Sequence, residues 1–309
     1  AVYPTHADDA NSMIRRADVA MYNAKHKRTG CSLYNAKDDL HNPGRLTMMT
    51  ELRQAIKQNQ LCLYYQPKID IKTAKCIGVE ALVRWNHPEK GQILPDIFIK
   101  DAEKSGTIKS LTQWVLTKAM EQSTLWNKEG FCIDMSVNIS ARDFQDPVLL
   151  KLIEDKISNS TLEPSCLTLE LTESAVMTDT KKAFDSLSKL DKMGVKLAID
   201  DFGTGYSSLD YLKRLPVDEL KIDRSFVIDM ATSKDDAAIV RSTIDLAHNL
   251  GLSVVAEGVE DQEALDLLKE MGCDTMQGYF TSRPLPANEI SEYLSKFPIK
   301  SCQAAKKVS

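Results

Sequence analysis

Residues 198–206 read AIDDFGTGY and carry two adjacent carboxylates, Asp200 and Asp201, from an apolar run into a glycine-bearing loop. The run that precedes them, residues 195–199, has the character of a short buried strand. Two acids placed together at a strand end repel each other, and a divalent cation or a shared proton usually compensates. The alternative is that these acids cap the next helix while the loop glycines shape a turn.

The same pattern recurs along the chain as a short apolar run with an acid, an amide or an amine in it or just after it. Five further runs show it, and their polar residues are Glu80, Asn138, Glu170, Glu173, Lys221, Asp223, Glu257 and Glu260. Amphipathic segments of helical length separate the runs. This alternation predicts βα units and a mostly parallel sheet.

Eight strands interleaved with helices over roughly 240 residues suit a closed (β/α)8 barrel, a modified TIM barrel. We expect strands near residues 61–66, 77–84, 132–139, 167–171, 195–199, 219–222, 253–256 and 275–276. We expect helices near residues 96–105, 110–128, 147–159, 178–193, 207–212, 234–250, 262–271 and 287–296. An open doubly wound sheet is the structural alternative, although no glycine-rich dinucleotide fingerprint supports it.

Catalytic groups of such a barrel come from the carboxyl ends of several strands. Six polar residues fall at those ends, namely Glu80, Asn138, Glu170, Asp200, Lys221 and Glu257. Each one taken singly can be a cap or a loop residue. Their convergence on one mouth of the barrel predicts a functional site.

Carboxylate and amide oxygens are ligands that Mg²⁺ or Mn²⁺ prefers, whereas zinc more often takes nitrogen or sulfur. Asp200 and Asp201 can bridge two metals, the arrangement common in phosphoester hydrolysis. Lys221 is the only base-type cation among the strand-end groups and can position or deprotonate the attacking water. Its alternative role is a structural ion pair with Asp200 or Asp223. Arg84 follows Glu80 by four residues and can hold a phosphate oxygen.

Composition limits the other function classes. The net charge of −5 argues against a general nucleic-acid surface, but metal ions can still join an acidic site to an anionic substrate. The seven cysteines include no CxxC pair, which favours reduced thiols over a zinc site or a disulfide framework. No apolar run approaches the ~20 residues of a membrane span. The reduced thiols favour a cytoplasmic domain. Because the chain does not begin with Met and has no signal-like start, we interpret it as a piece of a longer polypeptide, with any sensor or membrane anchor in the parent.

Seven motifs, in order, resemble those of one known family: EALVRW, SVNIS, ELTES, DDFGTGYSSL, ELKID, AEGVE and QGYF. They are similar to the EAL-domain phosphodiesterases, which hydrolyse cyclic di-GMP, and the match covers residues 49–294. The resemblance implies a modified TIM barrel with one antiparallel strand. It also implies two Mg²⁺ or Mn²⁺ ions in the site and the opening of one phosphodiester bond to give linear pGpG.

The resemblance assigns roles to individual residues. The implied ligands of the first metal are Glu80, Asn138, Glu170 and Asp200, and those of the second are Asp200, Asp201 and Glu257. Lys221 is the implied water-activating residue. Glu173 resembles the acid that holds the DDFGTGYS loop, which in the family couples metal binding to dimerisation, so a homodimer is expected. Substrate-side or supporting positions are Gln66, Leu82, Arg84, Asp223, Glu260 and Gln277.

The N-terminal part resembles a different family. The string RRADVAMYNAKHKRTG is similar to the last helix of a GGDEF diguanylate cyclase domain, without its catalytic part. We therefore expect a GGDEF remnant at residues 1–36, with a helix at 8–27 and a short strand at 31–34. A linker at 37–48, the EAL domain at 49–300 and a tail at 301–309 follow.

Three functions compete for this sequence. The first is an active metal-dependent phosphodiesterase. The second is an inactive receptor that binds cyclic di-GMP and acts through protein partners, and the third is an interaction scaffold. An inactive receptor typically lacks a metal ligand or the lysine, and here all of these residues are present. A scaffold leaves the acid cluster unexplained.

Overall fold

A closed barrel of strands organises the chain. The computed structural model describes residues 1–26, 30–35, 43–160, 162–177, 180–204 and 209–296. Within them, one sheet has the strand order β10-β1-β9-β8-β7-β6-β5-β4-β2-β3, and a further pairing of β1 with β2 closes the barrel. The strands are β1 (Leu61–Asp70), β2 (Cys76–His87), β3 (Gly91–Ile93), β4 (Asp134–Asn138), β5 (Leu167–Thr172), β6 (Lys196–Phe202), β7 (Glu219–Ile222), β8 (Ser253–Glu257), β9 (Thr275–Gln277) and β10 (Leu285–Pro286).

One barrel strand runs against the others. β2 and β4 to β9 pair in parallel around the barrel, whereas β1 is antiparallel to both of its barrel neighbours, β2 and β9. Residues 71–75 alone connect β1 to β2, which is too short for the crossover that a parallel pair needs. The prediction of a modified (β/α)8 barrel with one antiparallel strand is confirmed, and the open doubly wound sheet is excluded.

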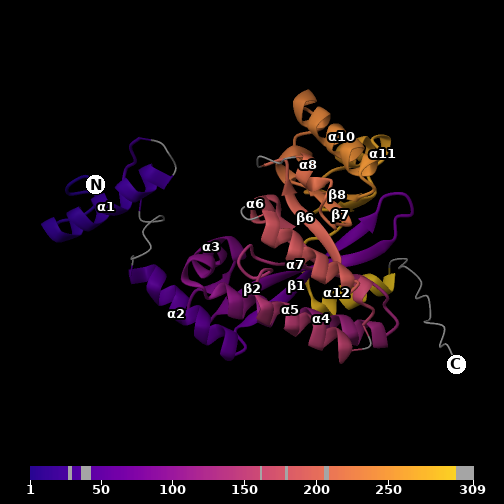
Figure 1. Cartoon of the computed structure of the whole chain (residues 1–309), viewed down its shortest axis with the longest axis horizontal. Helices are drawn as coiled ribbons and strands as arrows, with labels where there is room; N and C mark the ends of the chain where they lie inside the picture. Colours follow the sequence, from indigo (N-terminus) through magenta and orange to yellow (C-terminus); the bar gives the residue numbers. More distant parts are fainter. Residues whose placement is uncertain (27–29, 36–42, 161, 178–179, 205–208, 297–309) are drawn as a thin grey trace.

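The helices lie outside the barrel (Figure 1). They are α1 (Ala10–His26), α2 (Pro43–Lys57), α3 (Pro95–Ser105), α4 (Ile108–Lys128), α5 (Pro147–Ser158), α6 (Glu173–Met177), α7 (Thr180–Lys192), α8 (Leu209–Leu212), α9 (Arg224–Val227), α10 (Lys234–Asn249), α11 (Gln262–Glu270) and α12 (Ala287–Lys296). A 3₁₀ turn, η2 (Pro164–Cys166), precedes β5. α4 packs on β4, α7 on β6 and α10 on β8, so that the apolar face of each helix covers the sheet.

Several predicted boundaries were wrong. The helix expected at residues 178–193 is α7 (Thr180–Lys192), and residues 178–179 are outside the described part of the chain. The short helix α6 (Glu173–Met177) before it was not predicted. The strand expected at residues 31–34 is irregular backbone, because the described residues offer it no strand with which to pair. The short elements β3, β10 and α9 were not predicted, since runs of two to four residues carry little periodicity.

The buried core belongs to the barrel and its helices. Its members run from Met49 to Leu294. The buried residues of α1, Ala20 and Ala24, are not part of this core, and Figure 1 shows α1 lying away from the barrel. Among the described residues, no helix is long and apolar enough to cross a membrane.

The cysteines depart from expectation at one position. Those at positions 31, 62, 76, 166 and 273 are free thiols. Cys132 is disulfide-bonded, so the prediction of reduced thiols is wrong there.

Candidate active site

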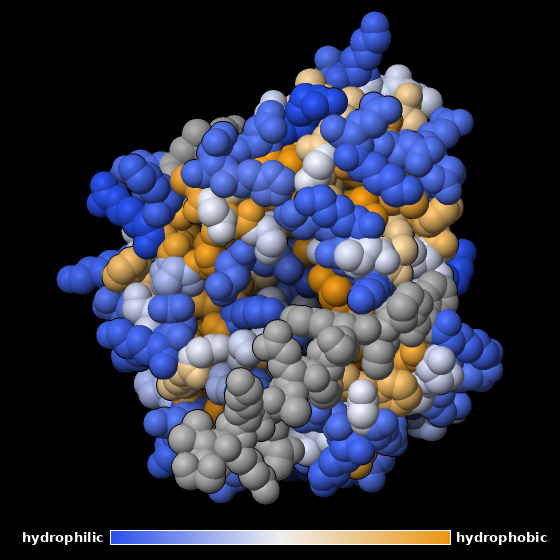
Figure 2. Space-filling view, turned by 90° about the vertical axis from the view of Figure 1, so that its right-hand side faces the viewer, coloured by the Kyte–Doolittle hydropathy of each residue, from blue (hydrophilic) through white to orange (hydrophobic). Residues whose placement is uncertain are grey.

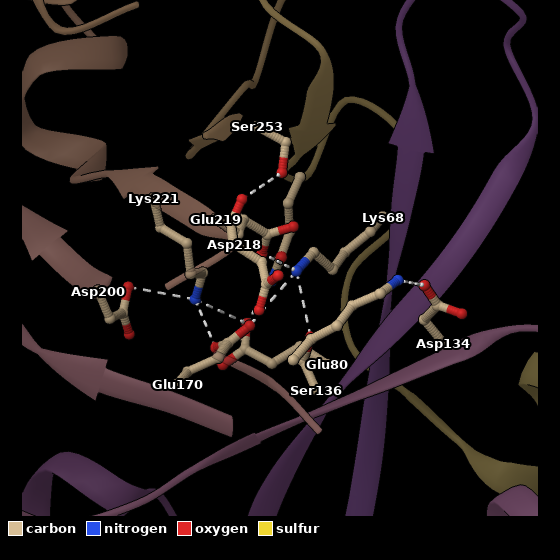
Figure 3. A network of polar contacts seen from close by, with 12 residues as sticks. Lys68, Glu80, Asp134, Ser136, Glu170, Asp200, Asp218, Glu219, Lys221 and Ser253 are labelled. Atoms are coloured by element: carbon tan, nitrogen blue, oxygen red, sulfur yellow. Dashed lines mark hydrogen bonds and ion pairs between the residues drawn. The ribbon is translucent and has the colours of Figure 1, made fainter. Parts of the chain in front are cut away.

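The site is built around the ammonium group of Lys221, which extends from β7 into the barrel and is completely buried. Its Nζ lies 2.6 Å from Glu170 Oε2, 2.6 Å from Glu257 Oε1, 3.2 Å from Asp200 Oδ1 and 3.7 Å from Glu80 Oε2. Figure 3 shows three of these acids around the lysine. The structure therefore brings together the acids that the sequence placed at separate strand ends.

The topology of the barrel explains this convergence. Parallel strands end at the same mouth, and every second side chain of a strand points inward. The pairing places Asn138 of β4 opposite Glu170 of β5, and Glu257 of β8 opposite Gln277 of β9. The acids are thus held at one level by rigid strands, which fix a site more firmly than loops do.

Asp200 and Asp201 share the site although they are adjacent in β6. In a regular strand neighbouring side chains point to opposite faces. Here the pairing of β6 with β7 shifts near the end of β6, and Asp201 has a positive φ of 55°. A β-bulge of this kind re-aims a side chain. Because both acids lie within β6, the alternative that they cap the next helix is wrong.

Three carboxylates lie close enough to share a cation. One ligand atom each from Asp200, Asp201 and Glu257 falls within 4.8 Å of the others. Among the described residues, Glu80, Glu170, Asp200, Asp201 and Glu257 cluster here, and the ammonium group of Lys221 lies among them. The donor set is rich in oxygen and negative in charge, which fits hard divalent cations. Asn138 donates its amide hydrogen to Glu80 over 2.6 Å, so its carbonyl oxygen is the atom available to a cation.

The crowding of charge appears in the pKa values. Burial, together with the charges of Asp200 and Glu80, raises the pKa of Glu257 to about 8. Burial and the neighbouring Asp200 raise the pKa of Asp201 to about 6. Burial also raises the pKa of Glu80. These acids hold protons more tightly than free carboxylates do, and a cation can take the place of those protons.

The pKa values of Glu170 and Lys221 shift in the direction that favours the charged form of each group. Burial opposes ionisation of Glu170, but Lys221 and Lys68 outweigh it and lower the pKa of the carboxyl group. Burial likewise opposes the charge of Lys221, and the surrounding carboxylates raise its pKa well above the ordinary value. The two groups form a buried ion pair in the centre of the site.

Two glutamines support Glu80 from the antiparallel side of the barrel. Gln277 Nε2 donates to Glu80 Oε2 over 2.5 Å and to Gln66 Oε1 over 3.1 Å. Gln66 in turn donates to the carbonyl oxygen of Ser282 over 3.2 Å. The Oε1 atom of Gln277 is buried without a hydrogen-bond partner among the described residues. Gln66 and Gln277 are thus part of the site that the sequence predicted.

Glu173 lies against the start of the loop after β6. Its Oε2 accepts a hydrogen bond from the Gly203 amide over 3.0 Å, and the residue as a whole is 2% exposed. Gly203 has a φ of +100°, and a Cβ at this position would lie 3.0 Å from the Phe226 ring. Residues 205–208 of the same loop are outside the described part of the chain.

The remaining predicted positions lie around the cluster. Leu82 is half-buried and lines a cavity beside the acids. Arg84 donates to the Val83 carbonyl oxygen over 2.9 Å and makes no ion pair with the cluster among the described residues. Asp223 caps α9 and helps to raise the pKa of Asp201. Glu260 is exposed after β8, and the structure does not bring it to the cluster.

Sequence reasoning missed Lys68, which is 4% exposed within β1. Its Nζ lies 2.6 Å from Glu219 Oε1, 3.4 Å from Glu170 Oε1 and 3.1 Å from Ser136 Oγ. Burial opposes its charge, but Glu219 and Glu170 outweigh burial and raise its pKa. The sequence predicted that the strand ends at residue 66. Continuing the two-residue alternation of that strand from Gln66 would have placed Lys68 on the same inward face.

Two cavities lie beside these charged groups, one near the acids around Lys221 and one near Lys68. One, of about 540 Å³, lies beside the acids and is lined by Asn138, Asp200 and Asp201, with apolar residues of α3 and α4. The other, of about 510 Å³, lies at the opposite mouth of the barrel and is lined by Lys68 and Lys196 among others. Figure 2 views the molecule from the right-hand side of Figure 1 and shows a largely hydrophilic face that is hollowed near its centre.

Known proteins resemble this chain over most of its length. It is 42% identical over 292 residues to the bifunctional diguanylate cyclase/cyclic di-GMP phosphodiesterase MucR of Pseudomonas aeruginosa, covering 94% of this chain and 43% of that protein. It is 37% identical over 299 residues to the cyclic di-GMP phosphodiesterase NbdA of the same species, covering 96% and 38%. The chain thus spans about two-fifths of the length of these relatives.

Solved structures share the fold. A PaMucR phosphodiesterase in a c-di-GMP complex matches with a TM-score of 0.76 and 45% identity, over 79% of this chain and 99% of that one. The FimX EAL domain from Pseudomonas aeruginosa bound to c-di-GMP matches with a TM-score of 0.71 and 25% identity, over 77% and 96%. The family model described as EAL domain matches residues 49–284. With this match across the barrel and its acid-lined mouth, the chain belongs to the EAL domain family.

Proposed function

We propose that this chain hydrolyses cyclic di-GMP to linear pGpG with the help of two Mg²⁺ or Mn²⁺ ions. The observation that carries the proposal is the excess of negative charge at one mouth of the barrel. Five carboxylates of the described residues gather there around the ammonium group of Lys221. A cyclic dinucleotide is itself an anion, so this mouth can accept it only when cations balance the carboxylates.

We assign the metals to the ligands that the sequence suggested. Glu80, Asn138, Glu170 and Asp200 would hold one ion, and Asp200, Asp201 and Glu257 the other. Bound there, the ions would supply charge stabilisation to the phosphoryl oxygens and to the attacking and leaving oxygens. The spacing of the Asp200, Asp201 and Glu257 ligand atoms, within 4.8 Å of one another, supports the second group.

We assign Lys221 to the attacking water. Its ammonium is fixed by four carboxylates and can donate a hydrogen bond that orients the water beside the phosphorus. In hydrolysis, the water oxygen bonds to phosphorus, the bond from phosphorus to the 3′ oxygen breaks, and a proton reaches the leaving oxygen. The carboxylates keep Lys221 protonated in the metal-free site, so it can accept a proton only when cations neutralise those acids.

The cavity beside the acids supports a nucleotide substrate. It has a volume of about 540 Å³ and is open to the site through Asp200 and Asn138. Its lining also includes the apolar side chains of Ile99, Leu111 and Val115. A site with a polar edge and an apolar wall suits a phosphate joined to a purine base. We place Leu82 and Arg84 on the substrate side of this mouth.

We propose the catalytic domain at residues 49–300, with a linker at 37–48 and a tail at 301–309. The extent of the buried core, from Met49 to Leu294, supports this division. That residues 1–36 are the end of a GGDEF domain, that the domain forms a homodimer, and that a longer parent carries a sensor remain predictions.

The decisive experiment is turnover of cyclic di-GMP by the purified chain with Mg²⁺, with Mn²⁺, with EDTA and after Lys221→Ala. We expect pGpG that forms only with metal and only with the lysine. Tight binding of cyclic di-GMP without turnover would favour the inactive receptor. Turnover that persists in EDTA would contradict the metal-dependent mechanism.

A further inference from the structure

A second lysine holds the carboxylate of Glu170 from the side opposite Lys221. Glu170 is completely buried, and its two oxygens have different partners. Oε2 lies 2.6 Å from Lys221 Nζ, and Oε1 lies 3.4 Å from Lys68 Nζ. The two ammonium groups therefore flank one carboxylate along the axis of the barrel (Figure 3).

Lys68 is itself held in place. Its Nζ lies 2.6 Å from Glu219 Oε1 and 3.1 Å from Ser136 Oγ. Glu219 begins β7 and Ser136 is in the middle of β4, so both contacts come from rigid strands. A lysine held by two other strands cannot follow Glu170 if the carboxylate turns. Lys68 instead fixes the orientation of the Glu170 carboxylate within the site.

We infer that Lys68 is a positioning residue for the metal ligand Glu170, and that it sets the affinity of the site for a divalent cation. This inference rests on the proposed function, which makes Glu170 a ligand. Residues behind a metal ligand orient it and raise its affinity, and their loss typically costs about 10–100-fold in metal affinity or activity. Lys68 Nζ, 3.4 Å from Glu170 Oε1, holds the oxygen of the carboxylate that faces away from Lys221.

The alternative is that Lys68 only fills the interior of the barrel and neutralises Glu219. On that reading its replacement would lower the free energy of unfolding but leave the affinity of the site for Mn²⁺ unchanged. Metal affinity, measured without turnover, therefore separates positioning from a purely structural role.

The chain offers a matched control in Lys196. Its Nζ pairs with Asp134 Oδ2 over 2.7 Å, and both Lys68 and Lys196 line the cavity at the mouth of the barrel opposite the acids, here called the rear mouth. Lys196 has no contact with a carboxylate of the proposed metal site among the described residues. Lys196→Met thus removes a lysine from the same cavity without touching Glu170.

The test is calorimetric titration of the metal-free chain with Mn²⁺, for the wild type, Lys68→Met, Lys68→Arg and Lys196→Met. We expect Lys68→Met to weaken Mn²⁺ binding by about 10–100-fold, Lys68→Arg to regain part of the loss, and Lys196→Met to bind as the wild type does. Glu219→Gln keeps Lys68 but removes the charge that pairs with its ammonium group, so this variant replaces Lys68→Met in the test if Lys68→Met fails to fold. We expect Glu219→Gln to weaken Mn²⁺ binding less than Lys68→Met does.

Wild-type Mn²⁺ affinity in both Lys68→Met and Glu219→Gln would overturn the inference. Turnover at rising Mn²⁺ concentration gives the second readout, since a positioning role predicts that saturating metal restores much of the Lys68→Met rate. A wild-type chain that binds Mn²⁺ but turns over no cyclic di-GMP would overturn the proposed hydrolysis alone, because the affinity comparison would still decide the role of Lys68. A wild-type chain that binds no Mn²⁺ would overturn both.

Discussion

The two mouths of the barrel are lined by similar kinds of residues and differ in how their charges are balanced. At the rear mouth Lys196 pairs with Asp134 over 2.7 Å, and Lys68 pairs with Glu219 over 2.6 Å. Asp218 there accepts the Leu197 amide over 2.8 Å. The rear acids named here thus have a lysine or a backbone amide as partner. At the mouth that carries the acids, here called the front mouth, five carboxylates of the described residues gather around Lys221, and Lys68 reaches one of them, Glu170.

Cavity size does not distinguish the two mouths, since their volumes are about 540 and 510 Å³. The distinguishing feature is the uncompensated charge. Acids that are paired in place stabilise a fold, whereas acids crowded together at a cost in free energy indicate a ligand that removes the cost. The experiments below test that distinction, beginning with the largest expected effect.

Removing the ammonium group of Lys221 has the largest expected effect. Lys221→Met should lower kcat for cyclic di-GMP by about 10³-fold or more, within the range of a group that orients and activates water. Steady-state kinetics in saturating Mn²⁺ would measure it, with circular dichroism to check the fold. A loss of less than about tenfold would remove Lys221 from the proposed mechanism.

The crowded acids also predict an unusual dependence of stability on pH in the metal-free chain. The pKa of Glu257 is raised from 4.5 to about 8, and that of Asp201 from 3.8 to about 6. The folded chain then holds protons that the unfolded chain has released, so the free energy of unfolding falls as pH rises from about 5 to 8. Acids with lowered pKa values, such as Glu51, stabilise the fold fully above about pH 5 and do not change this slope.

Urea denaturation in EDTA at several pH values would measure this slope, and we expect a fall on the order of several kcal/mol, because each pKa unit corresponds to about 1.4 kcal/mol. Glu257→Gln should flatten it, because the amide does not titrate. Mn²⁺ should restore stability more at pH 8 than at pH 5, since the cation replaces protons that are already lost at the higher pH. A flat profile in the wild type would mean that the front acids carry no excess charge.

The contact between Glu173 and the loop after β6 has a smaller expected effect. Glu173→Ala removes the acceptor of the Gly203 amide and leaves the acids and Lys221 in place. A charge-assisted hydrogen bond is worth about 1.5–3 kcal/mol, and we expect kcat to fall by about tenfold as Asp201 loses its fixed position. Glu173→Gln, which keeps an acceptor oxygen, should recover much of the rate. Equal rates for the wild type and Glu173→Ala would contradict this role.

The sequence predicted the barrel and the front mouth better than the rear. The acids could be found because each stands at the end of an apolar run, and strand ends meet at one mouth in a parallel barrel. The sequence placed Asp201 in the site beside Asp200, but it could not show how two adjacent side chains of one strand reach the same site, because this depends on a bulge and a positive φ that no periodicity encodes. Lys68 was missed because it lies beyond the predicted end of its strand, on the one strand that runs antiparallel. Its contact with Glu170 depends on that direction.

The smallest effect is expected at the rear mouth. The side chains of Lys196 and Asp134 are 37% and 21% exposed, so water and salt screen their ion pair. Lys196→Met should change the free energy of unfolding by no more than about 1 kcal/mol and leave kcat unchanged. Chemical denaturation and steady-state kinetics would check both. Lys196 and Lys68 line the same cavity. A change in kcat for Lys196→Met would therefore mean that a charge at the rear mouth affects catalysis without contacting a proposed metal ligand. The selective role of Lys68 depends on its direct contact with Glu170, which Lys196 lacks.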